Sequence, residues 1–426
     1  MDDQNENLEA FIHAFNNDGE YDDEFDNALI LDRSVIPSAR PSQASYNKPN
    51  NWRDRNRIGL EKVKKQLQSC IDSVMHDRTF DLVLSHNIYG HQMMDNEEPI
   101  VWREPILDEY WDRIEAEIDR VRQLGIVTTM KGTHMLIMNV EMRKERLDAL
   151  VDIFRSGRAA NSCKNVTFTN TNLCGEGIIS LSRLVDVSLE SREFRLHHNR
   201  IDNMDSARCL SRSLKSHTRI NDLRLTHCDL GSSPEILLLI LQSDVKLIDL
   251  ENNNIDSLGA IKIAEYLEGN PPIRHIDLTH NRLNDDDVIL ISQALKRNTN
   301  LFTINLHSNN ITSIGVKALL NCVFDSSSLN AMSESNHTLG RLSLFTRQKN
   351  GSLADCIDKL LKLNRAQKIM MLALQDKDSL VQYLANVPVG LMPEVLAFPR
   401  WAADQPQYKH LNTVYSTMRW WNMYQV

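Results

Sequence analysis

The strongest constraint on the fold is a short frame of apolar and polar residues that recurs six times between residues 166 and 311. The six copies read VTFTNTNL, FRLHHNRI, LRLTHCDL, IDLENNNI, IDLTHNRL and INLHSNNI. Each copy has two apolar residues with one residue between them, a small polar residue three positions later, and a further apolar residue. The polar positions, which lie 28, 29, 25, 28 and 28 residues apart, are Thr171, Asn199, Cys228, Asn253, Asn281 and Asn309. This constant frame predicts a stack of similar structural units, one for each copy.

The residue types within the frame predict one strand and one helix per unit. The paired apolar residues alternate with polar ones, as at Ile276 and Leu278, which is typical of a strand with one buried side. Apolar residues also follow the polar position by 10 and 14 residues, as Ile291 and Leu295 follow Asn281, and this is helical spacing. Neither element buries its apolar side alone. We therefore expect an α/β solenoid with a parallel sheet inside the curve and helices outside it.

The polar position of each unit turns inward, where its side chain needs hydrogen-bond partners. Successive units should therefore form an interior ladder of polar side chains, in which the loss of one member costs roughly 1–3 kcal/mol. The predicted structural ladder consists of Asn199, Cys228, Asn253, Asn281 and Asn309.

A frame of this kind at a period of 28 residues is similar to the ribonuclease-inhibitor-like class of leucine-rich repeats. That class includes the ribonuclease inhibitor, the Ran GTPase-activating proteins and the sensor arrays of NOD-like receptors. The resemblance implies a right-handed leucine-rich-repeat horseshoe flanked by helical segments. Whole phrases, among them NTNLCGEGIISL, LHHNRID and VYSTMRWWNM, also resemble a large leucine-rich-repeat family of diatoms over residues 130–426. The second resemblance implies the same fold and a cytoplasmic origin, and it assigns no biochemistry.

The repeats define a central solenoid at residues 131–362, because two weaker copies of the frame, MLIMNVEM and LGRLSLFTR, extend it at either end. Residues 51–130 are interpreted as a helical N-terminal cap that has room for one or two degraded repeats. This cap is expected to contain a basic helix, a strand at 80–84 (FDLVL) and a second helix at 105–125.

The two ends of the chain are predicted to lie outside the solenoid. Residues 363–426 form a helical C-terminal cap of short segments broken by prolines, and Trp420 and Trp421 are expected to pack on the open end of the stack. Residues 1–50 form a disordered acidic arm. Eleven acidic residues and one arginine give residues 1–33 a net charge of −10, whereas the whole chain carries −9. The arm either keeps the chain soluble or contacts a basic surface.

The sequence lacks the short motifs that mark common catalytic and cofactor sites: a P-loop, an HExxH zinc motif, a GxSxG nucleophile elbow and an EF-hand loop. Seven cysteines without C-x-x-C spacing, and no secretory apolar segment after Met1, favour reduced thiols in the cytoplasm and leave a nuclear location open. The longest apolar run, ILLLIL at 236–241, is too short to span a membrane. We expect a monomeric, cytoplasmic, non-enzymatic protein with no cofactor, metal site, membrane span or nucleic-acid partner.

The polar residues between the paired apolar residues point to the concave face, where neighbouring strands lie about 4.8 Å apart. They form a centre column of Thr167, Arg195, Arg224, Asp249, Asp277 and Asn305. Beside it lies a turn column of Asn170, His198, His227, Asn252, His280 and Ser308. The candidate binding residues on this face are Arg195, His197, His198, Arg224, His227, Asp249, Glu251, Asn252, Asp277, His280, Asn305 and His307.

Like charges are adjacent in the centre column, and they repel unless nearby opposite charges, such as Glu193 and Asp222, relieve them. Two interpretations stay open for the face. It is either a solvated surface with local ion pairs worth ~0–1 kcal/mol each, or a bipolar groove that matches charged patches on a partner. His198 and His227 are close enough to share a metal or to sense pH, but further ligands at matching positions are missing, so hydrated polar surface is the favoured interpretation.

The concave faces of solenoids commonly bind other molecules. The favoured function is therefore an interaction scaffold or recognition module that binds a protein partner. The resemblance to the Ran regulators implies a GTPase-activating role as an alternative, for which no catalytic residue matches by motif. A third hypothesis, a ubiquitin-ligase adaptor, rests on the segment LMPEVLAFP at 391–399, which is too short for an F-box.

Overall fold

The structure of this 426-residue chain is a computed structural model. It describes residues 52–77, 79–80, 82–85, 105–124, 129–130, 134–156, 163–188, 190–327 and 329–344, together with 357, 360–362 and 368. The predicted acidic arm and nearly all of the predicted C-terminal cap, with Trp420 and Trp421, lie outside the described residues.

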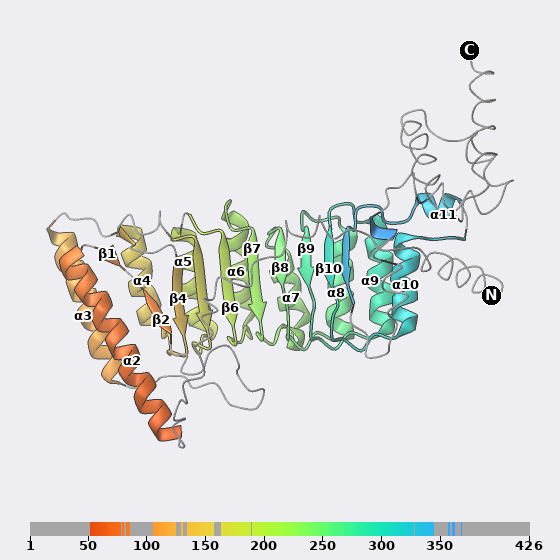
Figure 1. The fold of residues 1–426 in the computed structure, drawn as a ribbon. Helices are drawn as coiled ribbons and strands as arrows, with labels where there is room; N and C mark the ends of the chain where they lie inside the picture. The colour runs from red at the N-terminus through yellow and green to blue at the C-terminus, as the bar shows by residue number, and fades with distance from the viewer. Residues whose placement is uncertain are drawn as a thin grey trace, which may run out of the picture.

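Nine parallel strands form one open sheet along the length of the molecule (Figure 1). Each strand is hydrogen-bonded to its neighbours in chain order, and the two edge strands have one neighbour each. The strands are β2 (Val83–Ser85), β4 (His134–Met138), β5 (Asn165–Thr169), β6 (Glu193–His197), β7 (Asp222–Thr226), β8 (Leu247–Asp249), β9 (His275–Asp277), β10 (Thr303–Asn305) and β11 (Arg341–Ser343). The fold is the α/β solenoid that the repeated frame predicts.

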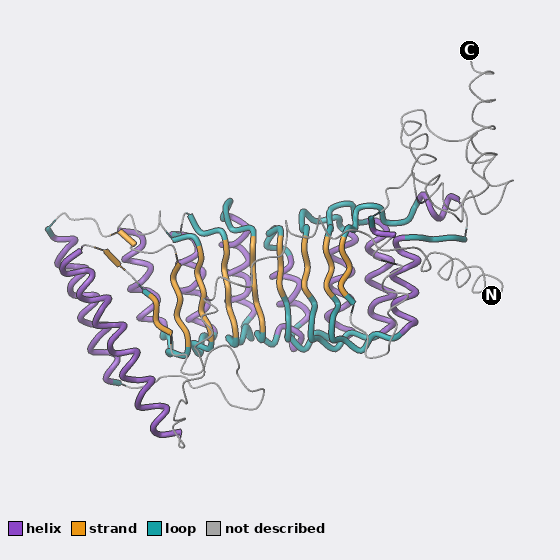
Figure 2. The backbone as a smooth tube through the Cα atoms, in the orientation of Figure 1, coloured by secondary structure: helices purple, strands orange, loops and turns teal. Residues whose placement is uncertain are grey.

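Helices that connect successive strands cover one face of this sheet, whereas no described helix or strand covers the other face (Figure 2). The connecting helices are α4 (Lys144–Ser156), α5 (Gly175–Val187), α6 (Met204–Ser216), α7 (Pro234–Leu241), α8 (Ser257–Glu268), α9 (Asp285–Arg297), α10 (Ser313–Val323) and the short α11 (Leu329–Ser333). None of the helices in the described ranges is both long enough and apolar enough to cross a lipid bilayer.

The core lies between the sheet and the helices, and the frame fills it as its alternation requires. Ile276 and Leu278 of β9 and the turn after it are fully buried, as are Ile291 and Leu295 of α9. The same positions are buried in the neighbouring repeats, and they merge into one continuous apolar core. A strand or helix of a single repeat leaves its apolar side exposed, so this burial depends on the stacking of repeats.

The sheet begins earlier than the predicted start of the solenoid at residue 131. Strand β2 pairs with β4, so part of the predicted N-terminal cap is itself a repeat. The segment FDLVL, predicted as one strand, contributes to two: β1 (Thr79–Phe80) pairs with β3 (Thr129–Met130) in a separate two-stranded sheet, and β2 joins the main sheet. Helices α2 (Trp52–Asp72) and α3 (Ile106–Gln123) pack side by side at this end (Figure 1), and a π-helical turn, η2 (Ser73–Asp77), follows α2.

One repeat is shorter than the others, because only 25 residues separate Cys228 from Asn253. Its helix α7 has 8 residues, against 12 in α8, and a short 3-10 helix, η4 (Leu230–Ser232), precedes it. Gly231 of η4 lies so close to the next repeat that a Cβ there would be 2.3 Å from the carbonyl oxygen of Asn254. The close approach therefore restricts this position to glycine.

Candidate functional site

The centre column is continuous on the uncovered face of the sheet. Strand pairing places Arg195 beside Arg224, Arg224 beside Asp249, and Asp249 beside Asp277. Thr167 precedes this series on β5 and Asn305 follows it on β10. All these side chains are partly exposed, whereas the apolar residues between them are buried. The period of two in the strands and the parallel pairing together produce one row of polar groups across six repeats.

The two arginines of the centre column are already paired with carboxylates of their own strands. Arg195 lies 2.5 Å from Glu193, and Arg224 lies 3.1 Å from the same carboxylate. Arg224 also donates two hydrogen bonds to Asp222, at 3.1 and 3.0 Å. These ion pairs offset the repulsion between the adjacent guanidinium groups, and they fix the orientation of both side chains.

The acidic side chains of the centre column take part in local turns. Asp249 and Asp277 each accept a hydrogen bond from the backbone N–H two residues later, at 3.0 and 2.8 Å, and Asn305 does the same at 3.2 Å. Asp277 also accepts a bond from the amide of Asn305 at 3.0 Å. Burial, and then the negative charges of Asp277 and Glu251, raise the pKa of Asp249 to about 6. Through these hydrogen bonds, both carboxylates stabilise the turns that follow their strands, and they also contribute charge to the surface.

The turn column lies at the end of each strand, and every member has a left-handed backbone. The φ values are 49° for Asn170, 52° for His198, 55° for His227, 57° for Asn252, 54° for His280 and 54° for Ser308. Asn and His are enriched in this conformation, which costs most L-residues energy. The left-handed backbone thus explains why asparagine and histidine are common in the turn column, and the sequence pattern did not predict this conformation.

The histidines divide into two groups on the uncovered face. His198 and His227 stack with ring centroids 4.1 Å apart and 20° between their planes, and His197 contacts the Thr226 hydroxyl on the next strand. His280 lies edge-on to His307, with centroids 6.0 Å apart. Burial, and then nearby positive charges, lower the pKa of His197 to about 4 and that of His227 to about 4, and burial lowers the pKa of His198. Within the described ranges, no group of three metal-ligating side chains comes together.

The asparagines of the structural ladder link neighbouring repeats inside the core. The Asn281 side-chain oxygen accepts from the backbone N–H groups of Asn253 and Ile255, both at 3.0 Å. Its amide donates to the carbonyl groups of Leu250 and Leu278, both at 3.0 Å. Asn199, Asn253 and Asn309 make bonds of the same kind, and the Cys228 thiol contacts the carbonyl groups of Leu196 and Thr226 at 3.5 Å.

Thr226 and Thr279 belong to the same face and were not singled out from the sequence. Thr226 is the partner of His197, and Thr279 takes the frame position that Glu251 has in the preceding repeat. Thr279 is 8% exposed, and its hydroxyl has no hydrogen-bond partner among the described residues. The repeat frame itself could have located both, because their positions correspond to His197, Glu251 and His307.

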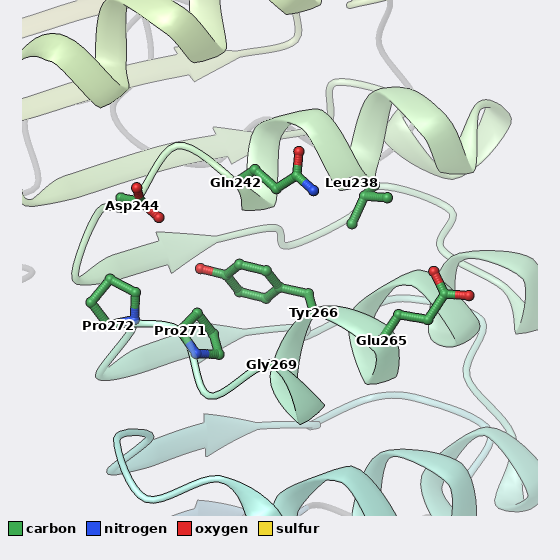
Figure 3. A pocket seen from close by; sticks show the side chains of 8 residues that line it. All are labelled: Leu238, Gln242, Asp244, Glu265, Tyr266, Gly269, Pro271 and Pro272. Atoms are coloured by element: carbon green, nitrogen blue, oxygen red, sulfur yellow. The ribbon is translucent and has the colours of Figure 1, made fainter.

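The helical side carries a shallow depression of about 440 Å³ between α7 and α8 (Figure 3). Leu238, Gln242 and Asp244 line one side of it, and Tyr266 projects from α8 between them and the pair Pro271–Pro272. Asp244 forms an ion pair with Lys215 at 2.8 Å. Tyr266 lines this depression beside the short helix α7, and the residue is 9% exposed.

Comparison with known proteins identifies the repeats. Residues 269–292 and 297–320 match the family described as Leucine Rich repeat. A search of curated proteins finds no match to the sequence. Among solved structures, the chain is similar to the actin-binding site 2 of leiomodin-1, with 18% identity over 43% of this chain and 99% of that one and a TM-score of 0.29. It is also similar to internalin C2 of Listeria monocytogenes, with 14% identity over 48% of this chain and 84% of that one and a TM-score of 0.23.

Proposed function

We propose that this leucine-rich-repeat chain is a non-enzymatic interaction module that binds a protein partner on the uncovered face of its sheet. One observation carries the proposal: the centre column places Arg195, Arg224, Asp249 and Asp277 in a single continuous row on a face that no described element covers. Charged groups in a fixed row provide specificity, because a partner must match their order. The connecting helix in each repeat supports the ribonuclease-inhibitor-like type of solenoid.

The side chains of the row are held in place before any partner arrives. The Arg195 side chain is 31% exposed and that of Arg224 is 22% exposed, and their ion pairs restrict the available rotamers. Binding therefore costs little side-chain entropy on this side of the interface, which favours affinity. The segment LMPEVLAFP of the adaptor hypothesis lies outside the described residues.

The proposal is tested by affinity capture with a tagged full-length chain, followed by mass spectrometry and a binding titration with each recovered protein. The test variant is Arg195→Glu/Arg224→Glu, which reverses two charges of the row. The matched control is Arg183→Glu/Arg208→Glu, because both of those arginines are about half exposed on the helical side, in α5 and α6. We expect the test variant to weaken capture at least ~10-fold, as for the loss of a buried interfacial charge, and the control to retain it.

Thermal melting of both variants shows whether the fold is retained. If the reversed charges beside Glu193 lower the melting temperature, Arg195→Gln/Arg224→Gln replaces the test variant. A partner whose affinity is insensitive to substitutions on the sheet face, but sensitive to those on the helices, would place the binding surface elsewhere and contradict the proposal.

A further inference from the structure

The two halves of the centre column differ in whether their charges are already neutralised. On β6 and β7, Arg195 and Arg224 share two carboxylates within 3.1 Å, so that half carries no net charge. On β8 and β9, Asp249, Asp277 and the neighbouring Glu251 form no ion pair with any described residue. These three carboxylates form the acidic half of the face.

The acidic half is concentrated on two adjacent strands. Asp249 and Asp277 are paired in register on β8 and β9, so their backbones are about 4.8 Å apart. Glu251 follows two residues after Asp249, beside the buried Thr279 hydroxyl, which lacks a partner within the described ranges. The carboxylates and this hydroxyl together offer several hydrogen-bond acceptors on one small area.

The surroundings of the acidic half add little positive charge. Burial lowers the pKa of His227, on the preceding repeat, and of His275, two residues before Asp277, so both rings are neutral at pH 7. The charge of Arg224 on the adjacent strand partly offsets the burial that raises the pKa of Asp249, but the ion pairs of Arg224 are with Asp222 and Glu193. Arg341 on β11 is in register with His275, so it lies farther from Asp277 than the ~9.6 Å that separates β9 from β11. The negative charge of the acidic half is thus not neutralised by an ion pair with a described residue, and a partner can neutralise it.

We propose that the partner bound by this face presents a basic segment, and that Asp249, Glu251 and Asp277 hold its arginine or lysine side chains. The inference rests on the proposed function and adds the chemistry of the partner. Guanidinium and ammonium groups are donors only, so they suit a surface whose charged groups are carboxylate acceptors, and arginine can bind one carboxylate with two hydrogen bonds. The internally paired arginines then set the register of the complex and are not its main source of attraction.

The probe for this proposal is the peptide Gly-Arg-Gly-Arg-Gly-Arg-Gly-amide, which carries carboxyfluorescein on its N-terminal amine. In an extended strand its three arginines project to one side. A matched peptide contains citrulline, which has the same shape and no charge. Fluorescence anisotropy with the full-length chain measures both affinities at pH 7.5 and low salt. We expect the arginine peptide to bind at least ~10-fold more tightly, and its affinity to fall as salt screens the attraction.

The test variant is Asp249→Asn/Asp277→Asn. Asparagine keeps the acceptor that caps each turn, as Asn305 does in the next repeat, so the fold should be retained. Its matched control is Glu265→Gln/Glu268→Gln, which removes the same charge from α8 on the helical side. We expect the test variant to lose at least ~10-fold in affinity for the arginine peptide, and the control to stay within ~2-fold.

Three results would overturn the inference: equal affinity for the citrulline peptide, an equal loss in the α8 control, or no loss in Asp249→Asn/Asp277→Asn. The last of these, combined with loss of partner capture in Arg195→Glu/Arg224→Glu, would leave the proposed function standing and make the arginine half the anchor. If both pairs of substitutions leave partner capture unchanged, the proposed function itself fails. The two claims are therefore separable in one set of variants.

Discussion

His198, His227 and Asn252 occupy the same position in three consecutive repeats, and all three have φ between 52° and 57°. Asparagine and histidine tolerate this left-handed conformation better than most residues. An imidazole in the turn column is therefore compatible with the backbone, but the backbone does not require it, since Asn252 and Ser308 serve the same turn. His198 and His227 stack on each other, and burial lowers the pKa of both rings.

Replacing His227 with asparagine should make the fold less sensitive to acid. The pKa of His227 is about 4 in the folded protein, below the usual 6.5. Between pH 6.5 and pH 4, the imidazole is therefore protonated in the unfolded chain and neutral in the folded chain. Stability is therefore lost as the pH falls from about 6.5 to about 4. After discounting for solvent screening at this half-exposed ring, we expect His227→Asn to recover about 1 kcal/mol of the loss at pH 4.5.

Thermal melting at pH 7 and pH 4.5 measures this effect. Protonation of Asp249, whose pKa is raised to about 6, works in the opposite direction, but it is common to the wild type and the variant. Asn252→Ser is the control, because it changes the same turn position in a repeat without an imidazole there. Identical pH dependence in wild type and His227→Asn would show that this ring does not contribute.

At this scale the sequence predicted positions better than interactions. The register of Arg195, Arg224, Asp249 and Asp277 follows from alternation and repetition alone. The left-handed backbone of His198 does not, because histidine is common in many conformations. The choice of Glu193 as a shared partner for both arginines also depends on side-chain rotamers, which no period in the sequence encodes.

Among the elements, the shortened repeat departs most from the regular frame. The sequence shows that this repeat has 25 residues, but it does not show which element is shortened. In the structure, η4 forms part of the connection and helix α7 is short. The strand predicted at 80–84 overlaps β2, but its place in the main sheet was not predicted, although Asn87 stands three residues after Leu84 as the ladder position requires. Pairing with β4, a contact distant in sequence, defines it.

Substitution of Gly231 in η4 should destabilise the fold far more than an ordinary glycine-to-alanine change. A Cβ at Gly231 would lie 2.3 Å from the Asn254 carbonyl oxygen and 2.5 Å from its carbon, so the backbone of the next repeat must move. We expect Gly231→Ala to cost about 2 kcal/mol or more, as for an overpacked core position. Urea denaturation followed by circular dichroism measures the change.

Gly175, the first residue of α5, is the matched control, since a Cβ there meets no atom within 4 Å. Gly175→Ala should leave the stability unchanged or raise it by about 0.5 kcal/mol, because alanine reduces the freedom of the unfolded chain. Equal effects of the two substitutions would mean that the contact between η4 and the following repeat can relax without cost.

At the scale of the whole molecule, the described helices and strands of each repeat pack mainly against those of its neighbours, so damage to one repeat should remain local. Asn281→Ala leaves two backbone N–H groups and the carbonyl groups of Leu250 and Leu278 without this partner in the core. The expected loss is about 3 kcal/mol, in line with buried groups left unpaired. Stability in such a stack is the sum of repeat and interface contributions, and a weak repeat can open on its own.

Hydrogen exchange with mass spectrometry tests this expectation. Faster exchange in Asn281→Ala should be confined to the elements around the substituted ladder position, from β8 to β10, while α4 and α5 keep the protection of the wild type. Lys262→Ala on the exposed side of α8 is the control and should change little. A uniform rise in exchange over residues 134–344 would show that the stack opens as one cooperative unit instead.

The left-handed turns also limit how this surface can be retargeted. A combinatorial library built on the chain could vary the strand-centre sites from Thr167 to Asn305 widely, since an extended backbone accepts every side chain except proline. The six positions of the turn column would have to be restricted to glycine, asparagine, aspartate, histidine and serine, because their backbone is left-handed. New specificity would consequently come from the strand-centre sites, while the turn column beside them keeps small or polar residues whatever the chosen target.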